Sequence, residues 1–223
     1  MIIAIDGPAG SGKSTVAKLV ARELGFRYLD TGAMYRAVAF RALASGASLF
    51  DEDAVARIAA TDEIVFVHEP GQPMPSRVFI AGDDVTRAIR LPRVDEAVSA
   101  VASLPRVREA MVAQQRKLGA ASDIVVEGRD IGTVVFPQAE VKVFLTATAE
   151  ERVRRRAAQQ AANGMVVDAT NLHASILRRD EADSTRDHSP LVSAPDAVVL
   201  DTTELKLGQV VSRIVSIARE RSA

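Results

Sequence analysis

The chain has 223 residues, enough to bury a substantial core, and its 28 Lys and Arg residues are balanced by 29 Asp and Glu residues. The net charge of −1 gives no overall positive field and only 4% of the residues are aromatic, so we expect no nucleic acid partner. The absence of cysteine excludes disulfides and thiolate metal sites, and no apolar run approaches the roughly 18 residues of a membrane span, so we expect a soluble, cytoplasmic protein with no membrane partner.

A glycine-rich loop stands at the start of the chain. Residues 2–5 predict a strand, residues 13–24 predict a helix, and the G-x-x-x-x-G-K-S pattern between them is typical of a phosphate-binding loop. Glycines let the backbone bend until several N–H groups converge on one anion, and the helix adds the positive end of its dipole. Lys13 would lie near the β- and γ-phosphates, and Ser14 would offer its hydroxyl to Mg²⁺. A tight glycine turn that only caps a helix is the alternative. We predict a nucleoside triphosphate site formed by Gly7, Pro8, Ala9, Gly10, Ser11, Gly12, Lys13, Ser14 and Thr15.

Several short apolar runs predict a central sheet. They lie at 2–5, 124–126, 141–145 and 197–200, with 26–30 as a further member, and are nearly continuous, as buried parallel strands are. Longer helical patterns lie between them, so the fold class is α/β, with helices on both faces of a parallel sheet. Pro105 predicts the start of a helix that Gly119 ends, with Ser103 as a capping candidate.

Two segments depart from this pattern. Residues 62–98 contain strand-like runs at 64–67 and 77–80 around a turn, which predicts a small β-rich insertion. Residues 150–190 are polar and rich in arginine, with helical spacing. Such a segment could close over bound phosphates as a lid and exclude water. The remaining residues, 1–61, 99–149 and 191–223, form the core of one domain.

The arginines of the second segment are spaced to share helix faces. Arg152, Arg155 and Arg156 fall on one face, and Arg179, Asp183 and Arg186 would share another. A solvated face with ion pairs is the ordinary interpretation of such runs. An enzyme that moves a phosphoryl group onto another phosphate must instead bring two polyanions together, and arginine binds phosphate with two parallel hydrogen bonds. The pattern favours a kinase with a phosphorylated acceptor over a simple hydrolase.

Polar residues follow two further strands. The segment 30–36, D-T-G-A-M-Y-R, and the segment 127–130, E-G-R-D, both end a strand and would meet at the carboxyl edge of the sheet, where α/β proteins bind ligands. Arg36 and Arg129 would reach the site, and a carboxylate there could organise Mg²⁺ and its waters. Thr31 as a helix cap and Gly128 as a plain turn are the structural alternatives.

Together these segments resemble the bacterial cytidylate kinase family over essentially the whole chain. The resemblance rests on the phosphate loop, residues 30–36, P-R-V-R at 105–108, G-R-D-I-G-T-V-V at 128–135, and the series from Arg179 through Asp183 to Arg186. It implies transfer of the γ-phosphoryl group of ATP to CMP or dCMP with Mg²⁺ in the cytoplasm, by a P-loop kinase fold that we expect to be monomeric. Glu127 stands where an aspartate is common in the family, and Thr31 where a serine often occurs.

The resemblance also implies roles for single residues. Ser99, Arg108 and Asp130 would read the cytosine and Asp183 would hold the ribose, while Thr31 and Tyr35 would line the same pocket. The phosphates would be contacted by Arg36, Arg129, Arg179 and Arg186. The last three of these, with Lys13, would be catalytic, and Arg155 would join the ATP-binding residues.

Two other functions compete with this interpretation. A P-loop kinase for a different monophosphate, such as UMP, would share the loop and lid and differ mainly where the base is read. A nucleotide-gated switch of the GTPase kind should carry D-x-x-G and N-K-x-D motifs, and neither occurs in the sequence.

Overall fold

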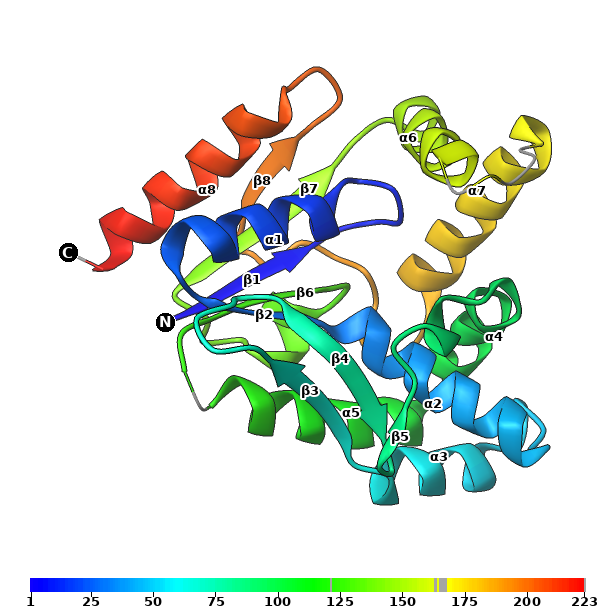
Figure 1. Ribbon diagram of the computed structural model, residues 1–223. Helices are drawn as coiled ribbons and strands as arrows, with labels where there is room; N and C mark the ends of the chain where they lie inside the picture. Colours follow the sequence, from blue (N-terminus) through cyan, green and yellow to red (C-terminus); the bar gives the residue numbers. More distant parts are fainter. Residues whose placement is uncertain (121, 163, 165–167, 223) are drawn as a thin grey trace.

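A central parallel sheet organises the molecule (Figure 1). The computed structural model describes residues 1–120, 122–162, 164 and 168–222. The five strands run in the order β2 (Arg27–Asp30), β6 (Ile124–Gly128), β1 (Ile2–Asp6), β7 (Val141–Thr146) and β8 (Val198–Asp201). Every neighbouring pair is parallel, so all five carboxyl ends meet at one edge. The predicted α/β fold with a parallel sheet is confirmed.

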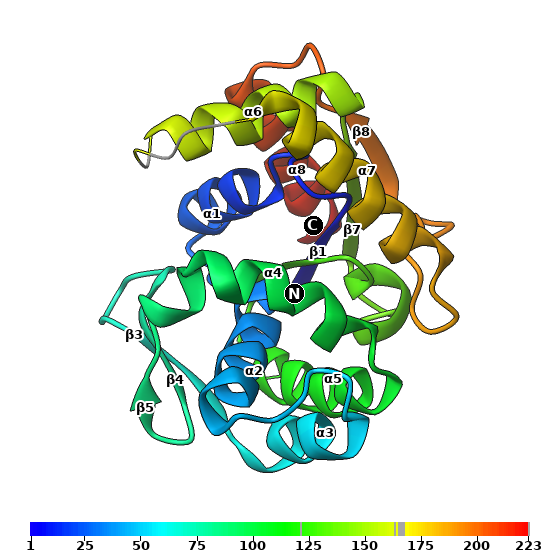
Figure 2. The ribbon, with the colours of Figure 1, turned by 90° about the vertical axis from the view of Figure 1, so that its right-hand side faces the viewer.

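Helices cover both faces of this sheet because its strands are apolar on both sides. Ile3 and Ile5 of β1 face α1 (Lys13–Leu24) and α8 (Leu207–Ser222), which pack against each other. Ala4 between them belongs to the core of the opposite face. That face is covered by α2 (Thr31–Ser45) and α5 (Pro105–Gly119), on which α3 (Glu52–Thr61) and α4 (Pro92–Ser103) pack (Figure 2).

The residues that cap the starts of α2 and α5 differ from those considered in the sequence analysis. The Asp30 carboxylate accepts a hydrogen bond from the Ala33 amide at 2.9 Å and caps α2, so Thr31 is not the cap. The prediction of Ser103 as the cap of α5 is wrong. Leu104 holds that position, and the Ser103 hydroxyl donates to the Ala100 carbonyl oxygen at 2.7 Å as the last residue of α4.

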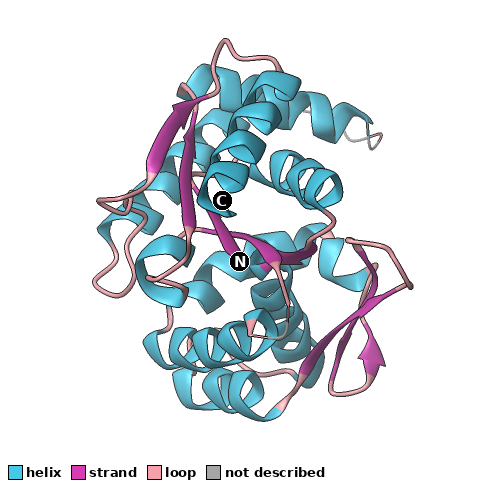
Figure 3. Ribbon diagram, turned by 90° about the vertical axis from the view of Figure 1, so that its left-hand side faces the viewer, coloured by secondary structure: helices cyan, strands magenta, loops and turns pink. Residues whose placement is uncertain are grey.

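A second, smaller sheet lies apart from the first (Figure 3). Its antiparallel strands are β3 (Ile64–His68), β4 (Pro75–Ile80) and β5 (Asp83–Asp84), and a short helix, η1 (Ala88–Arg90), leads from it to α4. The expected insertion is therefore β-rich in its first part and helical from Ala88 onward.

Two helices extend beyond the carboxyl edge of the central sheet. After β7 the chain forms α6 (Ala149–Ala162) and α7 (Ala169–Thr185), which pack together on the side where the strands end (Figures 1 and 2). A single π-helical turn, η2 (Ile131–Val135), follows β6 at the same edge. None of the helices in the described ranges is both long enough and apolar enough to cross a membrane.

Candidate active site

The glycine-rich loop connects β1 to α1 at the carboxyl edge. At Gly7, which has φ 145°, any side chain would overlap the carbonyl oxygen of Leu145, so the loop passes directly over β7. Gly12 takes up φ 91° immediately before α1, a conformation that favours glycine. These constraints turn the loop sharply enough to present consecutive backbone N–H groups at the start of a helix.

Lys13 is buried against the inside of this loop. Its Nζ donates to the Pro8 carbonyl oxygen at 2.7 Å, and only 6% of the residue is exposed. Burial lowers the pKa of Lys13 well below its ordinary value, and the nearby positive charge of Arg129 lowers it further. An anion placed here would favour the charged form of the lysine.

A hydroxyl and a carboxylate meet beside the loop. The Ser14 Oγ donates to Glu127 Oε2 at 2.8 Å, and the Tyr28 hydroxyl donates to Glu127 Oε1. Glu127 is buried, and burial together with the neighbouring Asp30 raises its pKa. The sequence identified Ser14 and a carboxylate at this edge, but not Tyr28, whose partner lies 99 positions away in the chain.

A buried ion pair lies on the α5 side of the site. Arg108 and Asp130 form a buried ion pair between α5 and the segment after β6, and the Arg108 guanidinium lies 5.5 Å from the centre of the Tyr35 ring. Although burial opposes it, contact with Tyr35 and Asp130 raises the pKa of Arg108. Burial also raises the pKa of Tyr35, to about 12.

The start of α2 contributes three of the expected residues. Arg36 Nη2 donates to Asp30 Oδ2 at 2.8 Å, and the Thr31 hydroxyl donates to the Glu127 carbonyl oxygen at 2.7 Å. Tyr35 projects from the same helix and is buried. The structure therefore ties α2 to the end of β6 at the carboxyl edge.

Arg179 of α7 and Arg186, which follows the last residue of this helix, lie close to arginines of the core. Burial lowers the pKa of Arg179, and the charges of Arg129 and Arg36 lower it further. Burial likewise lowers the pKa of Arg186, with a further contribution from Arg108. The Arg186 Nη2 is buried and has no hydrogen-bond partner among the residues that the structure describes. Such a concentration of partly desolvated positive charge is stabilised by an anion.

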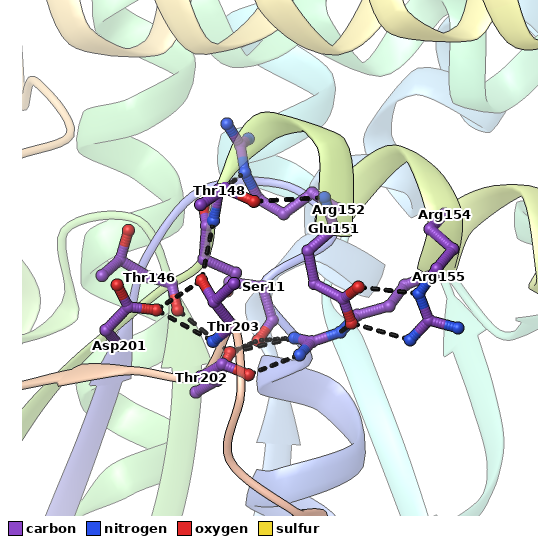
Figure 4. Close-up of polar contacts among 11 residues, drawn as sticks. Ser11, Thr146, Thr148, Glu151, Arg152, Arg154, Arg155, Asp201, Thr202 and Thr203 are labelled. Atoms are coloured by element: carbon purple, nitrogen blue, oxygen red, sulfur yellow. Dashed lines mark hydrogen bonds and ion pairs between the residues drawn. The ribbon is translucent and has the colours of Figure 1, made fainter.

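Two further residues that we expected in the site do not lie among its buried polar groups: Ser99 is exposed, and Arg155 is bonded to other protein groups. Ser99 lies on α4. Arg155 is engaged by protein groups: its guanidinium donates to Glu151, to the Ser11 carbonyl oxygen and to both oxygens of Thr202 (Figure 4). The spacing in the sequence placed Arg155 near the loop but could not identify these acceptors.

Asp6 is, like Tyr28, a buried residue at this edge that the sequence did not reveal as part of the site. The Asp6 carboxylate, at the end of β1, accepts hydrogen bonds from the backbone amides of Ile131 at 2.8 Å and Gly132 at 2.7 Å. Burial raises the pKa of Asp6 to about 6. The only signal in the sequence is a carboxylate at the end of an apolar strand, directly before the glycine loop.

Comparison with known proteins decides the family. A family model described as cytidylate kinase matches residues 3–220. The chain belongs to the cytidylate kinase family. It is an ATP-dependent nucleoside monophosphate kinase, as the combination of a phosphate loop and an arginine-rich acceptor side predicts.

Individual relatives agree over nearly their full length. The chain is 50% identical to the cytidylate kinase of Pelotomaculum thermopropionicum over 96% of this chain and 94% of the relative. It is 49% identical to the cytidylate kinase of Mycobacterium avium over 100% of this chain and 96% of the relative. Among solved structures, shikimate kinase from Bacteroides thetaiotaomicron has a TM-score of 0.51 at 13% identity, covering 98% of each chain, which supports the kinase fold alone.

Proposed function

We propose that this cytidylate kinase family member transfers the γ-phosphoryl group of ATP to CMP or dCMP, giving ADP and CDP or dCDP. The observation that carries the proposal is the position of the arginine cluster. Arg36 and Arg129 lie close enough to Arg179 to lower its pKa, and Arg129, Arg179 and Arg186 all act on Asp183. Arg36 and Arg129 follow β2 and β6 at the same sheet edge as the glycine loop, so two polyanionic nucleotides could meet end to end there.

The cytosine is the part of the acceptor that Arg108 and Asp130 would read, with Ser99 from α4. Cytosine presents an amino donor beside acceptor atoms, and a carboxylate paired with a guanidinium can satisfy both. Uracil would turn an acceptor toward the carboxylate of Asp130. The ion pair of Arg108 and Asp130 supports this role, because both side chains are almost fully buried and lie against each other.

The sugar and phosphates of the acceptor would occupy the space between the core and α7. Asp183 would hold the ribose, and Thr31 and Tyr35 would line the pocket. The phosphates would be contacted by Arg36, Arg129, Arg179 and Arg186. Lys13, with Arg129, Arg179 and Arg186, would stabilise charge on the transferred group. No strong general base is needed, because a phosphate oxygen is already a nucleophile and positioning supplies most of the acceleration.

Mg²⁺ fits the oxygen groups beside the phosphate loop. The Ser14 hydroxyl and the buried Glu127 carboxylate, 2.8 Å apart, are the kind of ligands that Mg²⁺ takes directly or through water. When bound, the ion would neutralise charge on the phosphates of ATP. Ser14 and Glu127 would hold it, and Tyr28 would orient the carboxylate.

Each segment of the chain would form a different part of the enzyme. Residues 62–98 would form the monophosphate-binding part, residues 150–190 a lid that excludes water during transfer, and residues 1–61, 99–149 and 191–223 the core of one domain. Residues 7–15, with Arg155 behind them, would bind ATP. We expect a monomeric enzyme that acts in the cytoplasm, where its nucleotide substrates are found.

The test is ADP release from Mg²⁺-ATP with each common nucleoside monophosphate in turn. CMP and dCMP should support the highest kcat/KM, and a reaction without acceptor should release little ADP. A higher kcat/KM with UMP would favour the rival kinase, and release of ADP that does not depend on any acceptor would favour a hydrolase.

A further inference from the structure

The direction of each carbonyl group in the phosphate loop determines the direction of the next residue's N–H group. In a trans peptide the C=O of one residue and the N–H of the next point in opposite directions. A loop whose N–H groups converge on phosphates must therefore direct its carbonyl oxygens away from them. Groups that bind those oxygens fix the orientation of the peptides, and hence the aim of the N–H donors.

Three of these carbonyl oxygens have side-chain donors. The Pro8 oxygen accepts from Lys13, and the Ala9 oxygen accepts from Arg152 Nη1 at 3.3 Å. The Ser11 oxygen lies 3.3 Å from both Arg155 Nη1 and the Thr202 hydroxyl. Because Ser11 C=O and Gly12 N–H belong to one peptide, this last contact sets the direction of the Gly12 N–H.

Thr202 lies at the centre of this last contact, directly after β8 (Figure 4). Only 3% of Thr202 is exposed. Its amide and hydroxyl lie 2.8 Å and 3.0 Å from the Thr146 carbonyl oxygen, so the residue is fixed to the end of β7. Its hydroxyl oxygen accepts from Arg155 Nη1 at 2.9 Å, and its carbonyl oxygen accepts from Arg155 Nη2 at 2.6 Å.

One hydroxyl therefore supports the Ser11 carbonyl in two ways. The single proton of the Thr202 hydroxyl is shared between the oxygens of Ser11 and Thr146, at 3.3 Å and 3.0 Å. The oxygen of the same hydroxyl holds the Arg155 Nη1 that also donates to Ser11. Arg155 is in turn held on α6 by Glu151, with 2.7 Å between Nε and Oε1. The contact thus joins β7, β8, α6 and the phosphate loop.

We propose that Thr202 is a positioning residue for the ATP phosphates, acting through the Ser11–Gly12 peptide and through Arg155. The inference rests on the proposed binding of ATP by residues 7–15. It assigns Arg155 to support of the loop from behind, since its donors already face Glu151, Ser11 and Thr202. It gives no role to Thr202 in binding the acceptor, whose proposed residues lie on other elements.

The test compares Thr202→Val with Thr202→Ser. Valine keeps the shape of the side chain but removes the hydroxyl, whereas serine keeps the hydroxyl. The dissociation constants of Mg²⁺-ATP and of CMP are measured separately by calorimetry, and KM for each substrate is measured together with kcat. We expect T202V to weaken ATP binding about tenfold, the loss typical of one hydrogen bond to a charged group. CMP binding should stay within about twofold of the wild type, and T202S should restore ATP binding.

Several results would overturn the inference. If T202V binds ATP as tightly as the wild type does, the Thr202 hydroxyl has no positioning role. The proposed function would still stand in that case, since the wild type binds ATP. Equal weakening of ATP and CMP binding would indicate a general loss of structure instead of positioning, and failure of T202S to restore ATP binding would exclude the hydroxyl as the cause. Thr202→Ala, which removes the hydroxyl without placing a methyl against the carbonyl oxygens, must give the same selective loss.

Discussion

Arg129 Nε donates to Asp183 Oδ2 across 2.8 Å, which joins the segment after β6 to α7. Both side chains are mostly buried, with 20% and 16% of their surfaces exposed. Although burial opposes it, the charges of Arg129, Arg179 and Arg186 keep the pKa of Asp183 below its ordinary value. This ion pair holds the guanidinium of Arg129, which follows β6, against α7 in the proposed lid.

Replacing Arg129 with alanine should lower kcat on the order of 10³-fold, because the charge on the transferring phosphoryl group loses a fixed stabilising partner. Release of ADP at saturating ATP and CMP measures the effect. Arg154→Ala is the matched control, since Arg154 pairs with Glu151 at the surface and has 71% of its side chain exposed. Turnover of R129A equal to that of R154A would refute the assignment.

Replacing Asp130 with asparagine should reduce the ratio of kcat/KM for CMP to that for UMP by at least about tenfold, since one carboxylate hydrogen bond to the base is lost. Breaking a buried ion pair also destabilises the fold by about 3 kcal/mol or more, so thermal unfolding must show that the variant is folded at the assay temperature. Asp196→Asn, at an exposed carboxylate that pairs with Lys142, is the control. An unchanged ratio in folded D130N would place the base reader elsewhere.

The Asp6 carboxylate predicts a dependence on pH. Below its pKa of about 6, protonation removes an acceptor for the Ile131 and Gly132 amides and loosens the segment that carries Arg129 and Asp130, so the affinity for CMP should fall between pH 7 and pH 5. The contribution of Asp6 to the free energy of unfolding should instead increase as the pH falls. The pKa is raised above the ordinary 3.8, so the stabilisation from Asp6 is complete below about pH 4 and is lost as the pH rises through 6.

Asp6→Asn separates these two effects. CMP affinity and the free energy of unfolding are measured from pH 4.5 to 7.5, a range chosen around the pKa of about 6. The free energy of unfolding of the wild type should fall relative to that of D6N by roughly 2 kcal/mol as the pH rises through this range. About 1.5 of the shifted units lie above pH 4.5, and one pKa unit corresponds to 1.36 kcal/mol. Parallel pH profiles for wild type and variant would show that Asp6 does not titrate in this range.

Replacing Glu127 with glutamine should raise the Mg²⁺ concentration for half-maximal activity about tenfold, because the amide carries no charge to hold the ion or its waters. The activity is titrated with Mg²⁺ at fixed ATP and CMP. Tyr28→Phe, which keeps the carboxylate but removes its hydrogen-bond donor, should have a smaller effect in the same direction. Identical Mg²⁺ titrations for E127Q and wild type would exclude Glu127 from the proposed ion site.

The sequence predicted most of the elements that carry the site. The predicted helices at 13–24 and 105–119 agree with α1 and α5. Gly25 caps the end of α1 and Pro105 starts α5, because glycine and proline favour these positions independently of the rest of the fold. The cap of α5 was mispredicted since Leu104, held in an extended conformation before proline, leaves Ser103 inside the preceding helix.

Long-range polar contacts were the part that could not be predicted. Asp6 and its two amide donors lie 125 and 126 positions apart, and Thr202 lies 191 positions from Ser11. Spacing along one helix predicts which arginines share a face, as it does for Arg152 and Arg155, but not which acceptors they reach. Those acceptors depend on the order of the strands, which the sequence did not specify.

The most direct test is a crystal structure with an analogue in which adenosine and cytidine are joined by a polyphosphate chain. The account predicts that the chain runs from the glycine loop to the guanidinium groups of Arg129, Arg179 and Arg186, with the cytosine against Arg108 and Asp130. Guanidinium groups that point into bulk solvent, or a cytidine bound away from Asp130, would contradict it.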